Sequence, residues 1–205
     1  MYYPAFLNLK GKNVLVVGGG KVALRKILNL IKFKAKVNVS APKAHERIAQ
    51  LAQIKKILLF KRKFLWQDLK NKDLVFCATN DSRLNQEISR GCRERSIWVN
   101  VVDRPALCSF IVPAIVKRGE VVFAVSTGGA SPALAKFLRA RLEKLFGKEL
   151  IVLSRGLKKI RKDLLRVSLK KRSAFLNKIL NEKMLNELKK GNVSGLNKEL
   201  LKNNF

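Results

Sequence analysis

The sequence predicts an α/β fold built on a doubly wound parallel sheet, and three observations lead to this prediction. Short apolar runs of strand length recur along the first half of the 205-residue chain. Segments with the 3.6-residue apolar period of an amphipathic helix separate these runs. Glycines at positions 18, 19 and 20 follow the first run directly, and a helical segment starts right after them. Strands that alternate with helices in this way are typical of a Rossmann-like parallel sheet covered on both faces.

The expected strands of this sheet end at turn residues. They lie at residues 13–17, 36–40, 57–60, 73–78 and 97–102, and the helices between them at about 21–33, 44–54 and 83–95. A lead-in of residues 6–12 turns at Gly11, and Asp81 or Ser82 can cap the third helix. Two further apolar runs, at 109–116 and 120–126, have no helix between them and predict an antiparallel hairpin.

A helical remainder follows the hairpin. Ser131 as N-cap and Pro132 at the first position predict a helix that runs to about residue 146. From Glu149 on the chain is basic and helical, and breaks are expected near Gly156, residues 167–168 and Gly191. Two apolar stripes predict the packing faces of a small helical domain. They consist of Leu153, Leu157, Ile160, Leu164 and Leu165, and of Phe175, Leu176, Ile179, Leu180 and Leu185.

The composition is strongly basic, with 44 Lys and Arg against 14 Asp and Glu and a net charge of +30. Residues 151–205 carry 15 of the basic and 4 of the acidic residues, so the excess is not confined to one arm. Three explanations stay open: binding of nucleic acid, a lysine bias of the whole proteome, and a small polyanionic substrate. The basic runs lack interleaved aromatics and RNA-reading motifs, which argues against nucleic acid.

No membrane span or disulfide framework is expected. The chain has no uninterrupted apolar segment of about 18 residues, and its first residues lack the pattern of a signal peptide. Cys77, Cys92 and Cys108 are odd in number and widely spaced, which fits reduced thiols better than disulfides or metal ligands. We therefore expect a cytoplasmic protein without a metal site, with Cys77 in the core.

The glycine-rich turn matches the dinucleotide-binding fingerprint G-x-G-x-x-G/A through Gly18, Gly20 and Ala23. The first glycine serves the tight turn, the second lets the backbone approach a pyrophosphate, and the small Ala23 permits close packing of helix on strand. A glycine-rich turn that binds nothing is the alternative. The acidic residue that usually holds the adenosine ribose is absent after the second strand. Ser40 and Lys43 stand there instead, so charge alone does not decide between NAD and NADP.

Ligands of such sheets bind outside the carboxyl ends of the strands. The glycine turn, Pro42, residues 79–80 and Asp103 should therefore converge on one crevice. The only tyrosines, Tyr2 and Tyr3, exclude the Tyr-x-x-x-Lys pair of short-chain dehydrogenases. The single histidine, His45, follows the second strand at the adenosine end, so a histidine acid/base and a multi-histidine metal site are not expected.

Asp103 is then the candidate general base, because it ends the fifth strand beside the expected nicotinamide position. Ser109, Thr127 and Ser131 are its expected polar neighbours. A purely structural role, in which Asp103 caps the turn before Pro105, is an equal alternative. The free N-terminus of the helix after Ser131 is a possible second anion site, with an ordinary cap as the alternative.

Six sequence blocks across residues 4–146 resemble the family of siroheme-synthesis dehydrogenases, which includes precorrin-2 dehydrogenases, some of them also sirohydrochlorin ferrochelatases. These blocks are Pro4-x-Phe6-x-x-Leu9-x-Gly11, Val17-Gly18-Gly19-Gly20-Lys21-Val22-Ala23-x-x-Lys26, Ala78-Thr79-Asn80-Asp81 with Leu84-Asn85, Asn100-Val101-Val102-Asp103, Ser109-Phe110-x-x-Pro113-Ala114, and Ser126-Thr127-Gly128-Gly129-Ala130-Ser131-Pro132-Ala133. The last block is far more specific than the glycine fingerprint. Residues 150–190 resemble the helical domain of the family only loosely.

The resemblance implies NAD-dependent oxidation of precorrin-2 to sirohydrochlorin by a homodimer, with ferrous-ion insertion as a second activity of bifunctional members. It implies three parts: an NAD-binding Rossmann domain at 1–113, a dimerisation segment of hairpin and helix at 114–147, and a helical domain at 148–205. Asp103 matches the aspartate assigned to proton removal and implicated in metal insertion, and Thr127 matches a position that lines the tetrapyrrole site. We expect no methyltransferase domain after the helical domain, and therefore no methylation of uroporphyrinogen.

The expected site residues form two groups. The cofactor-binding residues are Gly18, Gly19, Gly20, Lys21, Val22, Ala23, Ala41, Pro42, Lys43, Thr79 and Asn80. The substrate-binding residues are Ser109, Thr127 and Ser131, and Asp103 is catalytic. Precorrin-2 carries eight carboxylates, which accounts for part of the basic charge. The alternative function is a non-catalytic Rossmann module that senses nucleotides or binds nucleic acid.

Overall fold

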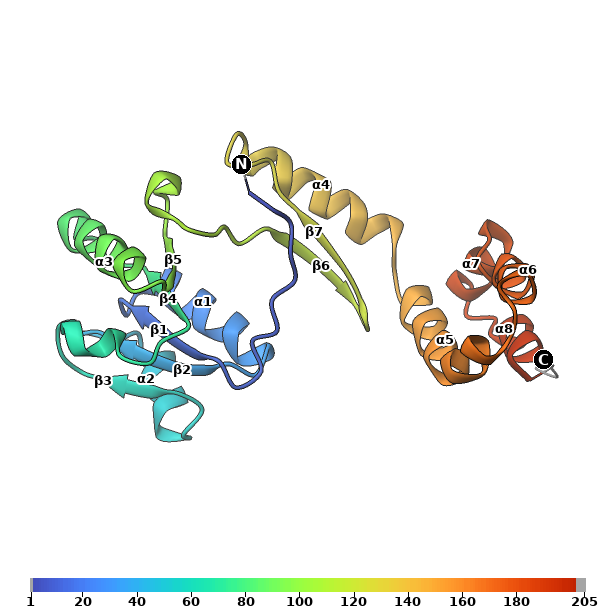
Figure 1. Cartoon of the computed structure of the whole chain (residues 1–205), viewed down its shortest axis with the longest axis horizontal. Helices are drawn as coiled ribbons and strands as arrows, with labels where there is room; N and C mark the ends of the chain where they lie inside the picture. The colour runs from blue at the N-terminus through green and yellow to red at the C-terminus, as the bar shows by residue number, and fades with distance from the viewer. Residues whose placement is uncertain (1, 202–205) are drawn as a thin grey trace. The chain divides into compact units, whose positions relative to one another are not determined.

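The computed structural model describes residues 2–201, and the chain divides into two compact units, Met1–Val112 and Pro113–Phe205. Figure 1 follows the chain from the blue N-terminal strands and helices to the red C-terminal helices. Within residues 2–201, the first unit holds the predicted parallel sheet, and the second holds a β-hairpin and five helices. No helix within residues 2–201 is long and apolar enough to cross a membrane.

The sheet of the first unit has five parallel strands in the order β3-β2-β1-β4-β5. The strands are β1 (Asn13–Val17), β2 (Lys36–Ser40), β3 (Leu58–Phe60), β4 (Leu74–Cys77) and β5 (Trp98–Val101). This order confirms the doubly wound sheet and places the carboxyl ends of β1, β2 and β4 side by side. All five strands fall within the predicted ranges, because each is a short apolar run bounded by turn residues.

The two faces of the sheet are covered by different helices, as the period of two along each strand requires. Val14 and Val16 of β1 pack against α1 (Lys21–Lys32) and α2 (Glu46–Gln53), whereas Leu15 and Val17 face the side of α3 (Ser82–Glu94). Short 3-10 helices, η1 (Trp66–Leu69) and η2 (Pro105–Leu107), lie before β4 and after β5. Each face thus has its own apolar core. The helices leave the carboxyl ends of the strands uncovered, and a ligand site is expected there.

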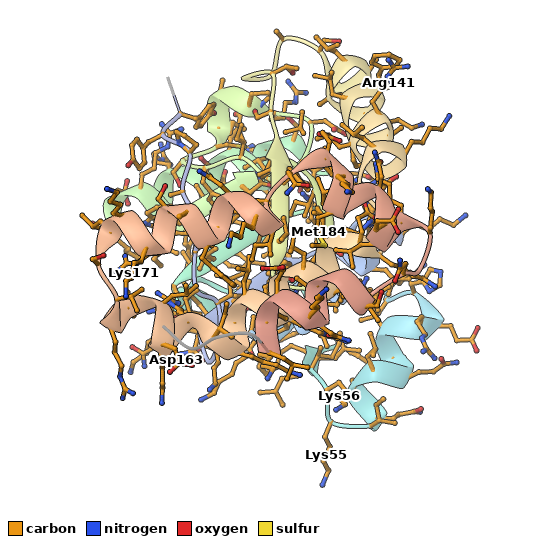
Figure 2. The ribbon with its side chains drawn as sticks, turned by 90° about the vertical axis from the view of Figure 1, so that its right-hand side faces the viewer. Lys55, Lys56, Arg141, Asp163, Lys171 and Met184 are labelled. Carbon is orange, nitrogen blue, oxygen red and sulfur yellow. The ribbon has the colours of Figure 1, made fainter. Side chains whose placement is uncertain are left out.

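The second unit begins with a hairpin of β6 (Ala114–Arg118) and β7 (Val121–Val125), paired antiparallel. Five helices follow: α4 (Pro132–Leu145), α5 (Glu149–Arg166), α6 (Leu169–Ile179), α7 (Glu182–Lys189) and α8 (Ser194–Leu201). Arg118 of the hairpin donates to the carbonyls of Phe146 and Glu143 at 2.9 and 3.1 Å, which ties the hairpin to the end of α4. Figure 2 looks onto the last helices, with Met184 among them and the exposed Lys171 at their rim.

The structure corrects three details of the helical and hairpin predictions. Residues 109–113 are not a strand, because Ser109 instead bonds to Val99 of β5. Gly156 does not break a helix but lies inside α5, where an added Cβ would meet the side chain of Leu200 at 2.9 Å. The expected breaks at 167–168 and at Gly191 are confirmed. Both predicted apolar stripes include one exposed residue, Leu165 in the first and Leu180 in the second.

Candidate functional site

A cavity of about 470 Å³ lies at the carboxyl ends of β1, β2 and β4. Its walls include most residues predicted to bind a cofactor: Gly18, Gly19, Gly20, Ala41, Pro42, Lys43, Thr79 and Asn80. Ser40, Lys63, Phe64, Asp81 and Leu84 also line it. Lys21, Val22 and Ala23 are not among the lining residues. Ala23 is fully buried below the cavity, where its small side chain packs in the core under α1.

The three glycines have different physical reasons for lacking a side chain. Gly18 has φ +119°, and a Cβ there would lie 2.3 Å from the carbonyl oxygen of Ala78. A Cβ on Gly19 would lie 2.2 Å from the carbonyl oxygen of Lys43. Gly20 has an ordinary extended conformation, and a Cβ there would meet nothing within 4 Å. The fold thus requires Gly18 and Gly19, whereas at Gly20 the missing side chain leaves open space on the cavity wall.

The amino end of α1 begins at this open space and has the features of an anion-binding helix terminus. Gly20 is the N-cap of α1, and no side chain within the described residues caps its first turn. By contrast, Asp81 caps α3, Ser131 caps α4 and His45 caps α2 through Nδ1. The first turn of α1 also holds no acidic residue. Free N–H groups at a helix start favour a phosphate, so this cradle fits the pyrophosphate of a dinucleotide.

The wall contributed by β4 is fixed by a buried asparagine. The Thr79 hydroxyl donates to Oδ1 of Asn85 at 2.7 Å, and Nδ2 of Asn85 donates to the carbonyl of Thr79 at 3.0 Å. Asn85 is buried in the first turns of α3, and Asp81 accepts from the amide of Leu84 at 2.9 Å. The loop after β4 is therefore held against α3 in one conformation, with Asn80 exposed beside the cavity.

The opposite wall rests on an ion pair between Arg62 and Asp68. The guanidinium donates to both carboxylate oxygens at 2.7 and 2.8 Å, and Asp68 also accepts from the amide of Leu65 at 3.0 Å. Hydrogen bonds from Arg62 hold the pKa of the Asp68 carboxyl below its ordinary value, against the effect of burial. The Ser40 hydroxyl donates to the carbonyl of Arg62 at 3.3 Å. The loop that carries Lys63 is thus anchored to the ends of both β2 and β3.

Loss of this ion pair should destabilise the first unit in a pH-dependent way. We expect Asp68→Asn to lower the free energy of unfolding near neutral pH by about 2–3 kcal/mol, because Arg62 loses a largely buried partner. The Asp68 carboxyl has a lower pKa in the folded protein than its value of about 3.9 in the unfolded chain, so the ion pair stabilises the fold at pH values above about 3.9. This stabilisation is lost as the pH falls through the pKa of the folded protein. The difference between wild type and variant should therefore shrink from pH 5 to pH 3, measured by urea unfolding.

A matched control is Glu87→Gln, which removes an exposed i,i+4 pair with Arg83 on α3. We expect it to change the free energy of unfolding by less than about 0.5 kcal/mol. Equal losses in the two variants, or a difference for Asp68→Asn that does not depend on pH, would contradict a stabilising role of the Arg62–Asp68 pair.

Asp103 lies outside the cavity wall, two residues beyond the end of β5. It is exposed and has φ +57°, the left-handed region that is uncommon for a residue other than glycine. Its carboxylate has no hydrogen-bond partner within the described residues 2–201. The turn that carries it is held by Cys108, whose thiol accepts from the amide of Val101 at 3.2 Å and donates to the carbonyl of Arg104 at 3.4 Å. The carboxylate is thus presented to solvent on a fixed turn.

Lys26 connects α1 with the strand that leads to Asp103. Its ammonium donates to Oδ1 of the buried Asn100 at 3.5 Å and lies 5.5 Å from the ring centre of Phe76. Nδ2 of Asn100 donates to the carbonyl of Phe110 at 3.1 Å. Burial lowers the pKa of Lys26, with Arg25 acting in the same direction and Cys108 and Asp103 opposing it. A partly desolvated cation therefore lies in the electrostatic field of the Asp103 carboxylate.

None of the three predicted substrate-binding residues is among the residues that line the cavity. Ser109 is tied to β5, where its hydroxyl accepts from the amide of Val99 at 2.7 Å. Thr127 and Ser131 belong to the second unit and close a turn, in which the amide of Ser131 donates to Thr127 Oγ1 at 3.1 Å. Gly128 and Gly129 of this turn have positive φ, and a Cβ on either would meet nothing within 4 Å. The turn thus offers accessible backbone of its own.

Several residues of the site were not singled out from the sequence. Lys63, Phe64 and Leu84 line the cavity, while Arg62 and Asp68 fix one wall. An arginine and an aspartate six residues apart give little sequence signal. By contrast, the prediction for Cys77 is confirmed: the thiol is buried, and burial raises its pKa. Burial also raises the pKa of Cys92 to about 12, so both thiols are protonated at neutral pH.

Two family models match the chain. The model described as "Putative NAD(P)-binding" matches residues 5–114, and the model "Sirohaem biosynthesis protein central" matches residues 124–145. The first covers more than half of the chain and includes the whole cavity. The second covers all of α4 and the turn before it.

Relatives and solved structures agree with these models. The siroheme synthase of Nitrosococcus oceani is 47% identical over 144 residues, 70% of this chain and 31% of that protein. The siroheme synthase of Pseudoalteromonas atlantica is 38% identical over 195 residues, 94% of this chain and 42% of that protein. The chain spans less than half the length of these relatives.

A solved structure titled "SirC, precorrin-2 dehydrogenase" matches with a TM-score of 0.78 and 27% identity. The match covers 97% of this chain and 98% of that one, so it extends over both compact units. The chain therefore belongs to the NAD(P)-binding family that the first model describes, and it is a relative of the siroheme synthases.

Proposed function

We propose that this protein is an NAD-dependent dehydrogenase that oxidises precorrin-2 to sirohydrochlorin. The observation that carries this proposal is the likeness to SirC, a precorrin-2 dehydrogenase, over nearly the full length of both chains. The cavity supports it independently, because the open space at Gly20 and the uncapped start of α1 fit a dinucleotide pyrophosphate. We propose a cytoplasmic location, which is consistent with a nicotinamide cofactor and with three free cysteines.

NAD, when bound, would accept a hydride from the substrate. The glycine turn would hold the pyrophosphate, and the loops after β2 and β4 would enclose the two ends of the cofactor. Removal of two hydrogens from precorrin-2 leaves a proton to be taken up as the hydride departs. Asp103 is the proposed acceptor of this proton, because its carboxylate is exposed, unpaired among the described residues and fixed by the turn after β5.

The proposed tetrapyrrole contacts are Ser109, Thr127 and Ser131. The turn of Thr127 and Ser131 supports this assignment, because its two glycines leave backbone groups open to a flat ligand. The basic surface also fits a substrate with eight carboxylates, since cationic walls attract and orient a polyanion. Figure 2 shows long side chains with blue nitrogen tips around the last helices.

The test is to incubate the purified protein with precorrin-2 and NAD under anaerobic conditions. We expect NADH and sirohydrochlorin to form in equal amounts, followed by their absorption spectra. Absence of NADH at every pH tested would overturn the proposed reaction. Ferrous ion added to the product then tests the second proposed activity, by comparing siroheme formation with the uncatalysed rate. Salt-dependent binding of nucleic acid without turnover would instead favour the non-catalytic alternative.

We also propose that the protein is a homodimer, with residues 114–147 as the dimerisation segment. The observation that favours this proposal is α4, which has no buried residue. Its exposed apolar side chains recur with helical spacing and form one stripe. They are Leu134, Phe137, Leu138 and Leu145. A contiguous apolar helix face of this kind marks a protein contact.

A charge placed in this stripe should dissociate the dimer. We expect Phe137→Glu to reduce the mass in solution from twice the chain mass of 23.2 kDa to a single chain, measured by light scattering after size exclusion. Burying an unpaired carboxylate in an apolar interface costs several kcal/mol, which is enough to shift a micromolar dimer. Lys136→Glu, one residue away, is the control and should stay dimeric. A monomeric wild type would contradict the proposal.

A further inference from the structure

The end of the cavity near β2 and β3 carries two lysines and no free carboxylate. Lys43 follows β2 and Lys63 follows β3, and both line the cavity together with Ser40, the last residue of β2. Neither lysine has an ion-pair or hydrogen-bond partner through its ammonium within residues 2–201. Both side chains are exposed, so the two ammonium groups are available to a ligand.

This end of the cavity is where the adenosine ribose lies in the fold. In dinucleotide-binding sheets the ribose is held at the end of the second strand, about 20 residues past the glycines. Ser40 occupies that position, 20 residues after Gly20, and is only 1% exposed. An acidic residue there would accept a hydrogen bond from the ribose 2′-hydroxyl and repel a 2′-phosphate. Serine carries no charge, so it does not repel a 2′-phosphate.

The carboxylates nearest this end do not offset the two lysines. Asp68 is neutralised by the bidentate pair with Arg62. Asp81 lines the cavity but follows β4, and β1 with its glycine turn lies between β4 and β2. Asp81 also caps α3 through its Oδ1. The positive charge is therefore confined to the ribose end, and the single lining carboxylate to the opposite end.

Both lysines stand on anchored backbone rather than on free loops. The loop of Lys43 is bound to the glycine turn, where the amide of His45 donates to the carbonyl of Gly19 at 2.8 Å. The loop of Lys63 is held by Arg62, whose Nη1 donates to the carbonyl of Lys63 at 3.0 Å. The amide of Ala41 donates to the carbonyl of Phe60 at 3.1 Å and joins the starts of the two loops.

From this arrangement we propose that Lys43 and Lys63 form a subsite for the 2′-phosphate of NADP, so that the cavity accepts NADP as well as NAD. The inference rests on the proposed function only in placing a nicotinamide dinucleotide in this cavity. Two ammonium groups that converge on a phosphate form charge-assisted hydrogen bonds, which compensate for the larger charge of NADP. The subsite sets cofactor choice and takes no part in the transfer of hydride or proton.

The test measures binding of four probes to the full chain by calorimetry: NAD, NADP, adenosine 5′-monophosphate and adenosine 2′,5′-bisphosphate. We expect wild type to bind NADP at least as tightly as NAD, and the bisphosphate more tightly than the monophosphate. The double variant Lys43→Glu with Lys63→Glu should weaken NADP and the bisphosphate by about tenfold or more. Its affinity for NAD should fall by a smaller factor than its affinity for NADP, because NAD has no 2′-phosphate.

Lys61→Glu is the matched control, because Lys61 is exposed in the same loop but does not line the cavity. It changes the net charge of the loop as Lys63→Glu does and should leave the ratio of NADP to NAD affinity unchanged. A wild type that binds NADP more than about tenfold more weakly than NAD would overturn the subsite. Equal weakening of both dinucleotides in the double variant, or the same change of ratio in Lys61→Glu, would also overturn it.

Failure of the proposed function gives a different result. A protein that binds both dinucleotides with these affinities but does not oxidise precorrin-2 retains the subsite and loses the proposed reaction. A protein that oxidises precorrin-2 with NAD and rejects NADP retains the reaction and loses the subsite.

Discussion

Asp103→Asn should lower kcat for precorrin-2 oxidation by about 100- to 10,000-fold, the range that a positioned general base contributes. Asparagine has the size of aspartate and fits the same turn, including its positive φ, which asparagine tolerates well. It cannot accept the proton, however. Affinity for NAD should be unchanged, because Asp103 does not line the cavity. Steady-state kinetics and calorimetry on the same preparation would show the two effects separately.

The control for this prediction is Glu94→Gln at the last residue of α3. The chain passes from there into the amino end of β5, so Glu94 lies at the opposite edge of the sheet from Asp103. Its rate should equal that of wild type. If Asp103→Asn kept the wild-type rate, Asp103 would be a turn residue and the base would lie elsewhere. If the variant lost NAD binding and folding together, the loss of rate would have a structural cause.

Gly20→Ala should weaken NAD binding by about 10- to 100-fold, the effect of forcing one methyl group into a close contact. The space at Gly20 is empty in the protein itself, so the new Cβ meets only the ligand. The backbone there is extended with φ −83°, which alanine adopts without strain. We expect the free energy of unfolding to change by no more than about 1 kcal/mol, the range of an N-cap substitution.

Gly18→Ala provides the contrast. It would place Cβ 2.3 Å from the carbonyl of Ala78 at a backbone angle that favours glycine. The first unit should therefore lose stability as well as affinity, visible in thermal unfolding without ligand. Gly18 and Gly20 lie two residues apart, but only Gly20→Ala should weaken NAD binding without destabilising the fold. Unchanged NAD affinity in a folded Gly20→Ala protein would place the pyrophosphate elsewhere.

The parallel sheet could be predicted from the sequence because its strands are buried on both faces. Such strands appear as short continuous apolar runs, and the turn residues at their ends fix the limits to within one or two residues. The predicted helix break at Gly156 was wrong, because it relied on the low helix propensity of glycine alone. In the structure α8 packs so closely on α5 that a side chain there would meet Leu200. Tertiary packing overrides local propensity at such a position.

The candidate site was predictable on the side that the glycine fingerprint describes. The fingerprint has a fixed spacing, and the fold rule for strand ends then indicates the loops after β2 and β4. Lys63 could not be found in this way, because its position depends on the pairing of β3 beside β2 and on the Arg62–Asp68 ion pair. The contact of Lys26 could not be predicted either. Its position in the helical period of α1 fits a solvent-facing residue, yet its ammonium reaches across β4 to Asn100.

The contact between Lys26 and Asn100 has a consequence for protein engineering. The helix that starts at the glycine turn carries, six residues later, the side chain that holds the strand before Asp103. The glycine turn that lines the cavity and the turn that carries the proposed base Asp103 are therefore not exchangeable modules. A chimera that took residues 13–33 from another nucleotide-binding domain without a lysine at position 26 would leave Asn100 with an unsatisfied buried oxygen. Such a graft would have to replace Asn100 together with the helix.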